Sequence, residues 1–320
     1  MDLLPWAGEP ESMVVTLETG DQIHYLDWRA AQPASTDGPA RWPLVLLHGL
    51  AQTGWSWAPV ARRLAPVVPV VAVDLRGHGL SDSPRAGYDL ESLAFDVLTV
   101  MTACGWGADA AGPPVVVAGH GLGAMVGATM AVLRPGSVGG LAMVDAGWER
   151  MDEATGMDAA EYQRTIGDPP EVLASMEAYL ADRRDFDPDS WDADQERAAR
   201  AAVDEKHAGH VAPVLRTHAQ RGAIAAMWLY EPGLTAGTVD LPLLVAVAEG
   251  TADDETARDR RLALDDLLRL RAGGNLAAAR VLRLPGAGHN LMRYRPVELA
   301  RALLELVGMA TSGRTPDDPR

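Results

Sequence analysis

The chain has 320 residues, of which 48% are hydrophobic, and its 28 basic and 44 acidic side chains give a net charge of −16. This length suits one large domain with an insertion. The acidic balance argues against nucleic acid and anionic membrane as partners.

Other features of the sequence bear on where the protein works. No run approaches the roughly 18 apolar residues that a membrane helix requires. Residues 1–13 lack the pattern of a secretory signal. Cys104 is the only cysteine, so no disulfide can form within the chain. We therefore expect a cytoplasmic protein that acts on a small molecule, and the sequence leaves a homodimer open.

The predicted elements begin with two strand-like pieces, residues 13–18 and 22–28, which Gly20 and Asp21 separate as in a hairpin. From residue 44 onward, short apolar strands alternate with longer helical segments, which predicts a doubly wound α/β sheet of about eight mostly parallel strands. The remaining strands are expected at 44–47, 70–74, 115–119, 141–145, 243–248 and 280–284. The helices are expected at 55–64, 90–104, 122–133, 257–272 and 296–307.

One connection is far longer than the others. Roughly a hundred residues separate the strand ending at Asp145 from the strand beginning at Leu243, and a loop of that length must have structure of its own. Because this segment is rich in charge and helix formers, we expect an inserted, mainly helical cap over residues 148–239. The core would then comprise residues 1–147 and 240–308, and the polar tail 309–320 is expected to be disordered.

The turn after the strand 115–119 carries the most informative motif. It runs Gly119-His120-Gly121-Leu122-Gly123 and leads directly into an apolar helical stretch. This is the frame of a nucleophile elbow, a sharp strand-to-helix turn that presents one side chain above the sheet. The presenting position normally carries Ser, and sometimes Cys or Asp. Here it is Gly121, which has no side chain to attack with.

Four further motifs follow predicted strands, at the end of the sheet where ligands of open α/β folds bind. They are His48-Gly49-Leu50, the run from Asp74 to Asp82 (DLRGHGLSD), Gly250-Thr251-Ala252-Asp253 and Gly286-Ala287-Gly288-His289. In this order and spacing, and together with the elbow, they resemble the α/β-hydrolase superfamily over about residues 13–308. The resemblance implies an α/β-hydrolase fold and an oxyanion hole formed by the backbone N–H groups of Leu50 and Leu122.

His289 is the candidate general base, because an imidazole exchanges protons near neutral pH. It needs a buried carboxylate to fix its tautomer and stabilise its charged form. We expect Asp253 to be that partner, since it follows the strand after the cap. Asp145, at the end of another strand, and Asp254, next in the chain, are the alternatives.

The tryptophan content suggests the character of the pocket. The chain has nine Trp and two Phe, and Trp offers a large apolar face with one hydrogen-bond donor. The expected substrate-binding residues lie beside the oxyanion turn, beside the elbow or in the cap: His48, Gly49, Trp55, Trp57, His120, Trp148, Met227 and Trp228. His120 is usually structural in the family. His207 and His210 lack a third ligand nearby, so we predict no metal, and no cofactor.

Three readings of Gly121 remain open. In the preferred one, glycine is native and the His/Asp dyad acts without a covalent intermediate on a small to medium apolar carbonyl compound. It would activate water, or move a proton as in a lyase, an epimerase or a cyclase. In the second, the chain is a Ser hydrolase inactivated at position 121. In the third it is a non-catalytic binding protein, although such a protein has no evident need of His289 and its acid.

Overall fold

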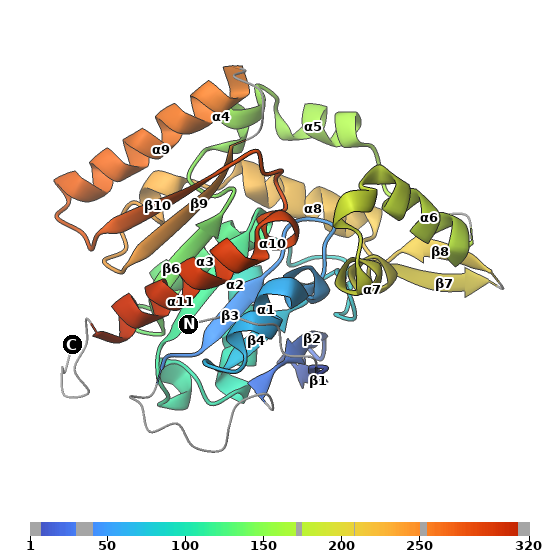
Figure 1. The fold of residues 1–320 in the computed structure, drawn as a ribbon, viewed down its shortest axis with the longest axis horizontal. Coiled ribbons are helices and arrows are strands. Elements are labelled where there is room, and N and C mark those ends of the chain that lie inside the picture. Colours follow the sequence, from blue (N-terminus) through green and yellow to red (C-terminus); the bar gives the residue numbers. More distant parts are fainter. Residues whose placement is uncertain (1–7, 30–40, 171–174, 208, 250–254, 313–320) are drawn as a thin grey trace.

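The computed structural model describes residues 8–29, 41–170, 175–207, 209–249 and 255–312. Its centre is an eight-stranded sheet of order β1-β2-β4-β3-β5-β6-β9-β10 (Figure 1). β1 and β2 form an antiparallel hairpin, β2 is antiparallel to β4, and the other neighbours are parallel. The strands are β1 Glu11–Thr16, β2 Gln22–Asp27, β3 Leu44–Leu47, β4 Val70–Val73, β5 Val115–His120, β6 Val138–Val144, β9 Leu243–Glu249 and β10 Ala279–Pro285.

Helices cover both faces of this sheet. In Figure 1, α1, α10 and α11 lie across the near face, and α2 and α3 lie behind it. The short helix η2 leads into α1, and α10 leads into α11. The bounds are η2 Gly54–Trp57, α1 Ala58–Leu64, α2 Leu90–Ala103, η3 Ala108–Ala110, α3 Leu122–Leu133, α9 Glu255–Gly273, α10 Leu291–Tyr294 and α11 Pro296–Ser312.

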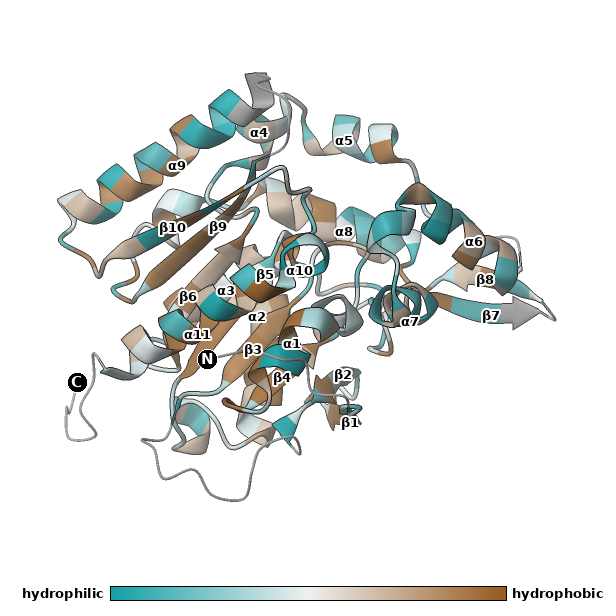
Figure 2. Cartoon of the chain, in the orientation of Figure 1, coloured by the Kyte–Doolittle hydropathy of each residue, from teal (hydrophilic) through white to brown (hydrophobic). Residues whose placement is uncertain are grey.

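The central strands are apolar on both faces because each face packs on helices. Every residue of β3, β4, β5 and β6 is buried, and these strands are among the most hydrophobic parts of the chain (Figure 2). Side chains alternate along a strand, so the same strands feed two cores. One core joins the sheet to α2, α3 and α9, and the other joins it to α1, α10 and α11.

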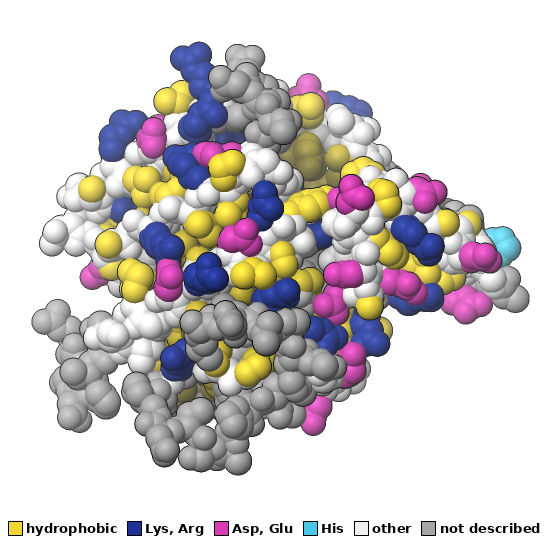
Figure 3. Space-filling model, in the orientation of Figure 1, with side chains coloured by type: hydrophobic (Ala, Val, Ile, Leu, Met, Phe, Trp, Pro, Cys, Tyr) yellow, Lys and Arg dark blue, Asp and Glu magenta, His cyan; other side chains and the backbone are white. Residues whose placement is uncertain are grey.

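The segment between β6 and β9 contains five α-helices, two short 3₁₀ helices and a two-stranded ribbon among its described residues. The elements are α4 Met151–Thr155, α5 Ala159–Ile166, α6 Met176–Phe186, η4 Pro188–Ser190, α7 Ala193–Ala201, β7 Val203–His207, β8 His210–Pro213, α8 Thr217–Trp228 and η5 Pro232–Leu234. The ribbon β7–β8 was not expected from the sequence, because its strands are short and partly polar. Acidic side chains are frequent over α6, α7 and the ribbon at the right of Figure 3.

The predicted fold class is confirmed: the chain has a mostly parallel sheet with helices on both faces. The expected disorder from residue 309 is wrong for residues 309–312. There α11 continues to Ser312, because Ala310 is 3% exposed and packs in the core beside Gly140. Residues 313–320 lie outside the described part of the chain. Within the described part, no helix is long and apolar enough to cross a membrane.

Candidate active site

The turn between β5 and α3 has the geometry that its glycines predict. Gly121 adopts φ 55° and ψ −121° between the two elements, a conformation that only glycine adopts without strain. A Cβ atom on Gly119 would lie 2.2 Å from the backbone of Gly123, and one on Gly123 would lie 2.4 Å from the carbonyl oxygen of Leu47. Both flanking positions therefore require glycine because backbones meet there.

Gly121 itself has room around it. A Cβ atom at this position would contact one neighbouring atom only, the Cα of Gly49, at 3.4 Å. The restriction at residue 121 is therefore one of backbone angle and not of space. A Cβ atom fits at this position without a steric clash.

Two backbone N–H groups in the loops around Gly121 have no acceptor among the described residues. Leu122 is the first residue of α3, and the N–H groups of a helix's first turn have no acceptor within the helix. In the loop after β3, the N–H of Gly49 donates to Gln52 Oε1 at 3.0 Å and that of Ala51 donates to His78 Nε2 at 3.2 Å. The N–H of Leu50, between them, has no acceptor among the described residues. Leu50 and Leu122 thus have donors available for an oxyanion.

His289 is paired with a carboxylate. Its Nδ1 lies 2.7 Å from Oδ2 of Asp145, whose side chain is 2% exposed, whereas the His289 side chain is 58% exposed. Asp145 directly follows β6 and also accepts, through Oδ1, from the N–H of Ala248 at 2.7 Å. With Nδ1–H donated to the carboxylate, Nε2 carries the lone pair that can take a proton.

The expected acid, Asp253, lies outside the described residues. The contact assigned to it is made by the alternative, Asp145. Since Nδ1 carries a single hydrogen, and that hydrogen is directed to Asp145, the assignment moves from Asp253 to Asp145. The physical reason is the order of the sheet: Asp145 directly follows β6, which is the neighbour of β9, so it lies at the same edge of the sheet as the end of the strand that precedes Asp253.

Arg260, which no sequence motif indicated, holds Asp145 in place. Arg260 of α9 donates from Nη2 to the Asp145 carbonyl oxygen at 2.8 Å and to its Oδ1 at 3.3 Å, and from Nε to Glu149 Oε1 at 3.1 Å. No local motif marks Arg260 or Glu149. Their roles depend on how α9 packs beside the end of β6.

A polar network joins the oxyanion loop to the histidine loop. Gln52 accepts from the N–H of Gly49 and donates to Asn290 Oδ1 at 2.6 Å. His120 donates from Nε2 to the carbonyl oxygen of His289 at 3.1 Å, and its Nδ1 lies 3.0 Å from Gln52 Oε1. The rings of His120 and His289 are 4.3 Å apart between centroids. Burial holds the pKa of His120 well below its ordinary value. His120 therefore positions the loop of His289, and Gln52 and Asn290 are functional candidates that the motifs alone missed.

His48, expected near the substrate, is instead part of the interior. It is fully buried, its Nδ1 donates to the carbonyl oxygen of Gly49 at 2.8 Å, and its Nε2 accepts from the N–H of Leu75 at 3.0 Å. Both ring nitrogens are thus occupied in bracing the oxyanion loop against the loop after β4. The prediction of a direct substrate contact is wrong for His48, although Gly49 lies next to the position that a side chain on Gly121 would occupy.

The histidines His48, His78 and His120 make stability depend on pH. Burial lowers the pKa of each, to about 3 for His78, whereas an unfolded histidine titrates near pH 6.5. Below about pH 6.5 the unfolded chain binds more protons, so the free energy of unfolding falls by up to about 1.4 kcal/mol per pH unit for each histidine. Urea denaturation between about pH 7.5 and 5.5, above most carboxyl titrations, measures this loss.

The matched variant is His78→Gln, which removes one of these groups. Its free energy of unfolding should fall less over the same interval, by about 1.4 kcal/mol in total between about pH 7.5 and 5.5. An unchanged slope would show that His78 takes up its proton in the folded state.

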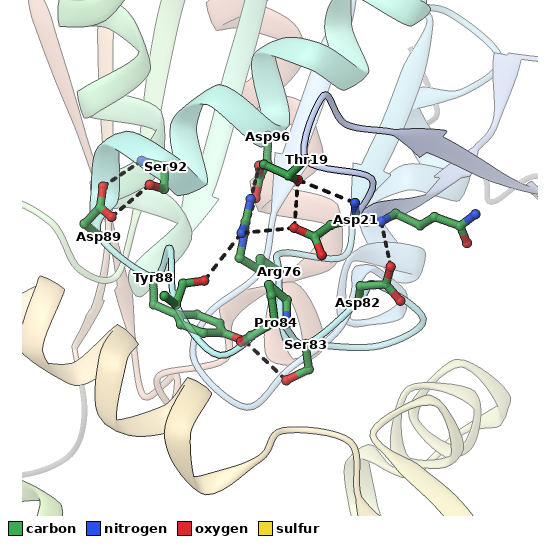
Figure 4. A network of polar contacts seen from close by, with 12 residues as sticks. Thr19, Asp21, Arg76, Asp82, Ser83, Pro84, Tyr88, Asp89, Ser92 and Asp96 are labelled. Carbon is green, nitrogen blue, oxygen red and sulfur yellow. Dashed lines mark hydrogen bonds and ion pairs between the residues drawn. The ribbon is translucent and has the colours of Figure 1, made fainter.

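The run from Asp74 to Asp82 is structural (Figure 4). The Arg76 guanidinium donates to both carboxylate oxygens of Asp96 at 2.7 Å, and Asp82 accepts from the N–H of Gln22 at 2.8 Å. Asp74 accepts from the N–H of Gly54 at 2.6 Å. Burial alone would raise the pKa of Asp74, but the hydrogen bond from His24 and nearby charges lower it. The run ties α2 and the β1–β2 hairpin to the loops that surround the site.

The three tryptophans expected to line the pocket differ in burial. Trp57 is 0% exposed, so it has no surface to offer a ligand and the prediction is wrong for it. Trp148 is 1% exposed, donates from Nε1 to the carbonyl oxygen of Arg260 and packs its ring against that side chain. Trp55 is half-buried beneath Arg197 of α7. A substrate contact stays a prediction for Trp55 and Trp148.

Met227 and Trp228 of α8 hold the inserted segment together. Met227 is 7% exposed and belongs to the core beneath α8. Trp228 donates from Nε1 to the carbonyl oxygen of Met157 at 2.8 Å and packs on Tyr162, with 4.8 Å between ring centroids. Any contact of these two with substrate stays a prediction. The absence of a metal site stays a prediction from the sequence. In the described part of the chain, no three His, Cys, Asp or Glu side chains form a group that could hold a metal ion.

Comparison with known proteins places this arrangement in a family. The alpha/beta hydrolase family model matches residues 44–302, so the chain belongs to that family. It is 32% identical over 143 residues to a 2-(acetamidomethylene)succinate hydrolase of Mesorhizobium japonicum, and 40% identical over 85 residues to a soluble epoxide hydrolase of Corynebacterium. These matches cover 44% and 27% of this chain. The first spans 49% and the second 28% of the relative's own length.

Solved structures show the same fold over nearly the whole chain. E-2-(acetamidomethylene)succinate hydrolase superposes with a TM-score of 0.71 at 22% identity, covering 93% of this chain and 99% of the other. A thioesterase domain from the curacin biosynthetic pathway superposes with a TM-score of 0.65 at 19% identity, covering 93% and 100%. At this level of identity the likeness establishes the fold alone.

Proposed function

We propose that this protein is a hydrolase in which His289 and Asp145 activate water for direct attack on a carbonyl carbon, without a covalent intermediate at residue 121. The observation that carries the proposal is an intact His289–Asp145 pair beside an elbow that has space but no nucleophile. A histidine paired with a buried carboxylate serves proton transfer, and it has no evident use in a protein that only binds a ligand.

The reaction follows from the orientation of the histidine. The water oxygen bonds to the carbonyl carbon while its proton passes to Nε2 of His289, and Asp145 stabilises the imidazolium that forms. The carbonyl oxygen takes up negative charge, which the N–H groups of Leu50 and Leu122 stabilise by about 3–4 kcal/mol for each donor. Collapse of this intermediate breaks the bond to the leaving group, which receives the proton from His289.

The proposed substrate is a small to medium carbonyl compound, an ester or an amide. The helices between β6 and β9 would act as the cap above it. The named relatives that share part of the sequence are hydrolases, one of 2-(acetamidomethylene)succinate and one of epoxides. Proton transfer on carbon, as in a lyase, an epimerase or a cyclase, uses the same base and the same donors and remains within the proposal.

The space for a side chain at Gly121 favours a second candidate function. Because a Cβ atom there meets one neighbour only, at 3.4 Å, the site is sterically compatible with a serine. The chain would then be a conventional Ser hydrolase that has lost its attacking oxygen.

The experiment is hydrolysis of a short p-nitrophenyl ester by the unaltered chain and by His289→Ala. The proposal expects activity above the uncatalysed rate that falls by roughly 10²–10⁴-fold in the variant, the usual contribution of a general base. Equal rates would leave the pocket with a binding role only.

A further inference from the structure

Gln52, in the loop after β3, holds both backbone polar groups of Gly49. Its side-chain Oε1 accepts from the N–H of Gly49 at 3.0 Å, and its own backbone N–H donates to the Gly49 carbonyl oxygen at 3.2 Å. That carbonyl belongs to the same planar peptide unit as the N–H of Leu50. The two bonds therefore limit the directions in which the N–H of Leu50 can point.

This loop needs such support because it contains a strained residue. Ala51 has φ 60°, in the left-handed region that residues with a Cβ atom rarely adopt. A residue persists in this region where the surrounding contacts impose it. Those contacts include the two bonds from Gln52 to Gly49 and the bond from the N–H of Ala51 to Nε2 of His78 at 3.2 Å.

The far end of the Gln52 side chain reaches the loop that carries the base. Its Nε2 donates to Oδ1 of Asn290 at 2.6 Å, and Asn290 directly follows His289. Asn290 also precedes α10, but its side chain makes no capping hydrogen bond to that helix. Within the described part of the chain, the Asn290 side chain is therefore held by Gln52 and has no part in stabilising α10.

Gly49 lets the two loops approach each other closely. A Cβ atom on Gly49 would lie 2.7 Å from Nδ1 of His120 and 3.2 Å from Oε1 of Gln52. His120 bonds in turn through Nε2 to the carbonyl oxygen of His289 at 3.1 Å. Two side chains that contact the loop of the base thus lie directly against the residue that precedes the oxyanion donor.

We propose that Gln52 is a positioning residue, which holds the N–H of Leu50 and the base His289 in one fixed arrangement. It acts through the two loops and takes no proton itself. The inference rests on the proposed function, since the N–H of Leu50 has this role only where a carbonyl oxygen becomes negative. A displacement of about 1 Å in a catalytic group can cost about 100-fold in rate.

The kinetic test is hydrolysis of p-nitrophenyl acetate by the unaltered chain, Gln52→Leu, Asn290→Ala and the double variant. Gln52→Leu removes both side-chain bonds, so kcat should fall by roughly 100-fold while KM stays within about threefold. Asn290→Ala removes one bond, and kcat should fall by roughly 10-fold. The double variant should be no slower than Gln52→Leu, because that variant has already lost the contact with Asn290.

The matched control is Gln220→Leu in α8. Gln220 is 7% exposed and donates from Nε2 to the carbonyl oxygen of Gly167 at 2.8 Å, so the same substitution removes a comparable bond elsewhere. It should lower stability but leave kcat within about threefold. A loss of kcat at constant KM in Gln52→Leu alone then separates positioning from general destabilisation.

A second measurement does not depend on catalysis. The amide signal of Leu50, observed by NMR in ¹⁵N-leucine-labelled chain and assigned by its loss in Leu50→Met, should shift in Asn290→Ala and stay in place in Gln220→Leu. If the unaltered chain hydrolyses nothing, the proposed function fails, whereas a shifted Leu50 signal still supports the coupling of the two loops. Asn290→Ala also serves if Gln52→Leu does not fold.

Four results would each overturn the inference. They are an unshifted Leu50 signal in Asn290→Ala, an unchanged kcat in Gln52→Leu, losses that add in the double variant, and an equal loss of kcat in Gln220→Leu.

Discussion

Gly121→Ser is expected to convert the protein into an efficient esterase on short p-nitrophenyl esters. The elbow, the two donors and the His289–Asp145 pair are already present, and the new Cβ would meet only the Cα of Gly49, at 3.4 Å. The backbone angle will cost about 1–3 kcal/mol in stability. Loss of a serine nucleophile typically costs on the order of 10⁶-fold in kcat, so even partial restoration should raise the rate by about 10³-fold.

The matched control is Gly121→Ala, which imposes the same backbone strain but supplies no oxygen. It should show none of the gain, and it should slow the unaltered reaction by occupying space that water needs. If Gly121→Ser shows no gain while remaining folded, the site does not support an acyl-enzyme. The reading of the chain as a disarmed Ser hydrolase would then fail, and non-covalent chemistry would remain.

Asp145→Asn is expected to reduce activity by roughly 10²–10⁴-fold, as much as loss of His289 itself, because the histidine is then held in the wrong tautomer. Asparagine preserves the shape of the side chain, but its amide N–H₂ can face Nδ1 of His289 only if the ring places its proton on Nε2. That nitrogen is then no longer available as the base. The rate of ester hydrolysis at saturating substrate measures the effect.

The comparison variant is Asp253→Asn, at the residue first expected to be the acid. It should keep activity close to that of the unaltered chain, because Asp145 already holds Nδ1 of His289 at 2.7 Å. A large loss in Asp253→Asn with normal activity in Asp145→Asn would return the role to Asp253.

The sheet could be predicted closely because burial on both faces leaves a clear signal in the sequence. β3 begins and ends where the apolar run Leu44–Leu47 does, and α3 occupies the predicted residues 122–133. The ribbon β7–β8 gave no such signal. Its strands are partly polar, so neither an alternating nor a continuous apolar pattern marks them.

The sequence predicted which motifs gather at the site because each motif directly follows a strand. Sequence order places Gly121, Leu50 and His289 at the same end of the sheet, and the structure brings their loops together through Gln52 and His120. The choice between Asp145 and Asp253 depended on the path of two loops after neighbouring strands, which spacing does not define. Burial of Trp57 likewise follows from packing against α1 and β4, and its sequence position beside the oxyanion turn gave no sign of it.

Arg260 illustrates what lies beyond any motif. It is one of several arginines in a charged helix, yet it alone among the described residues contacts both Asp145 and Glu149. A helix packed slightly differently would bring another side chain to that place. Contacts of this kind follow from tertiary packing, which a single sequence does not reveal.

The most direct test of the central claim is the intact mass of the unaltered chain during hydrolysis of a p-nitrophenyl ester. If His289 and Asp145 direct water to the carbonyl, product accumulates while the mass of the protein stays unchanged throughout turnover. Gly121→Ser, sampled in the same way, should gain the mass of one acyl group. An acyl group on the unaltered chain during turnover would contradict the account, because another side chain would then be the nucleophile.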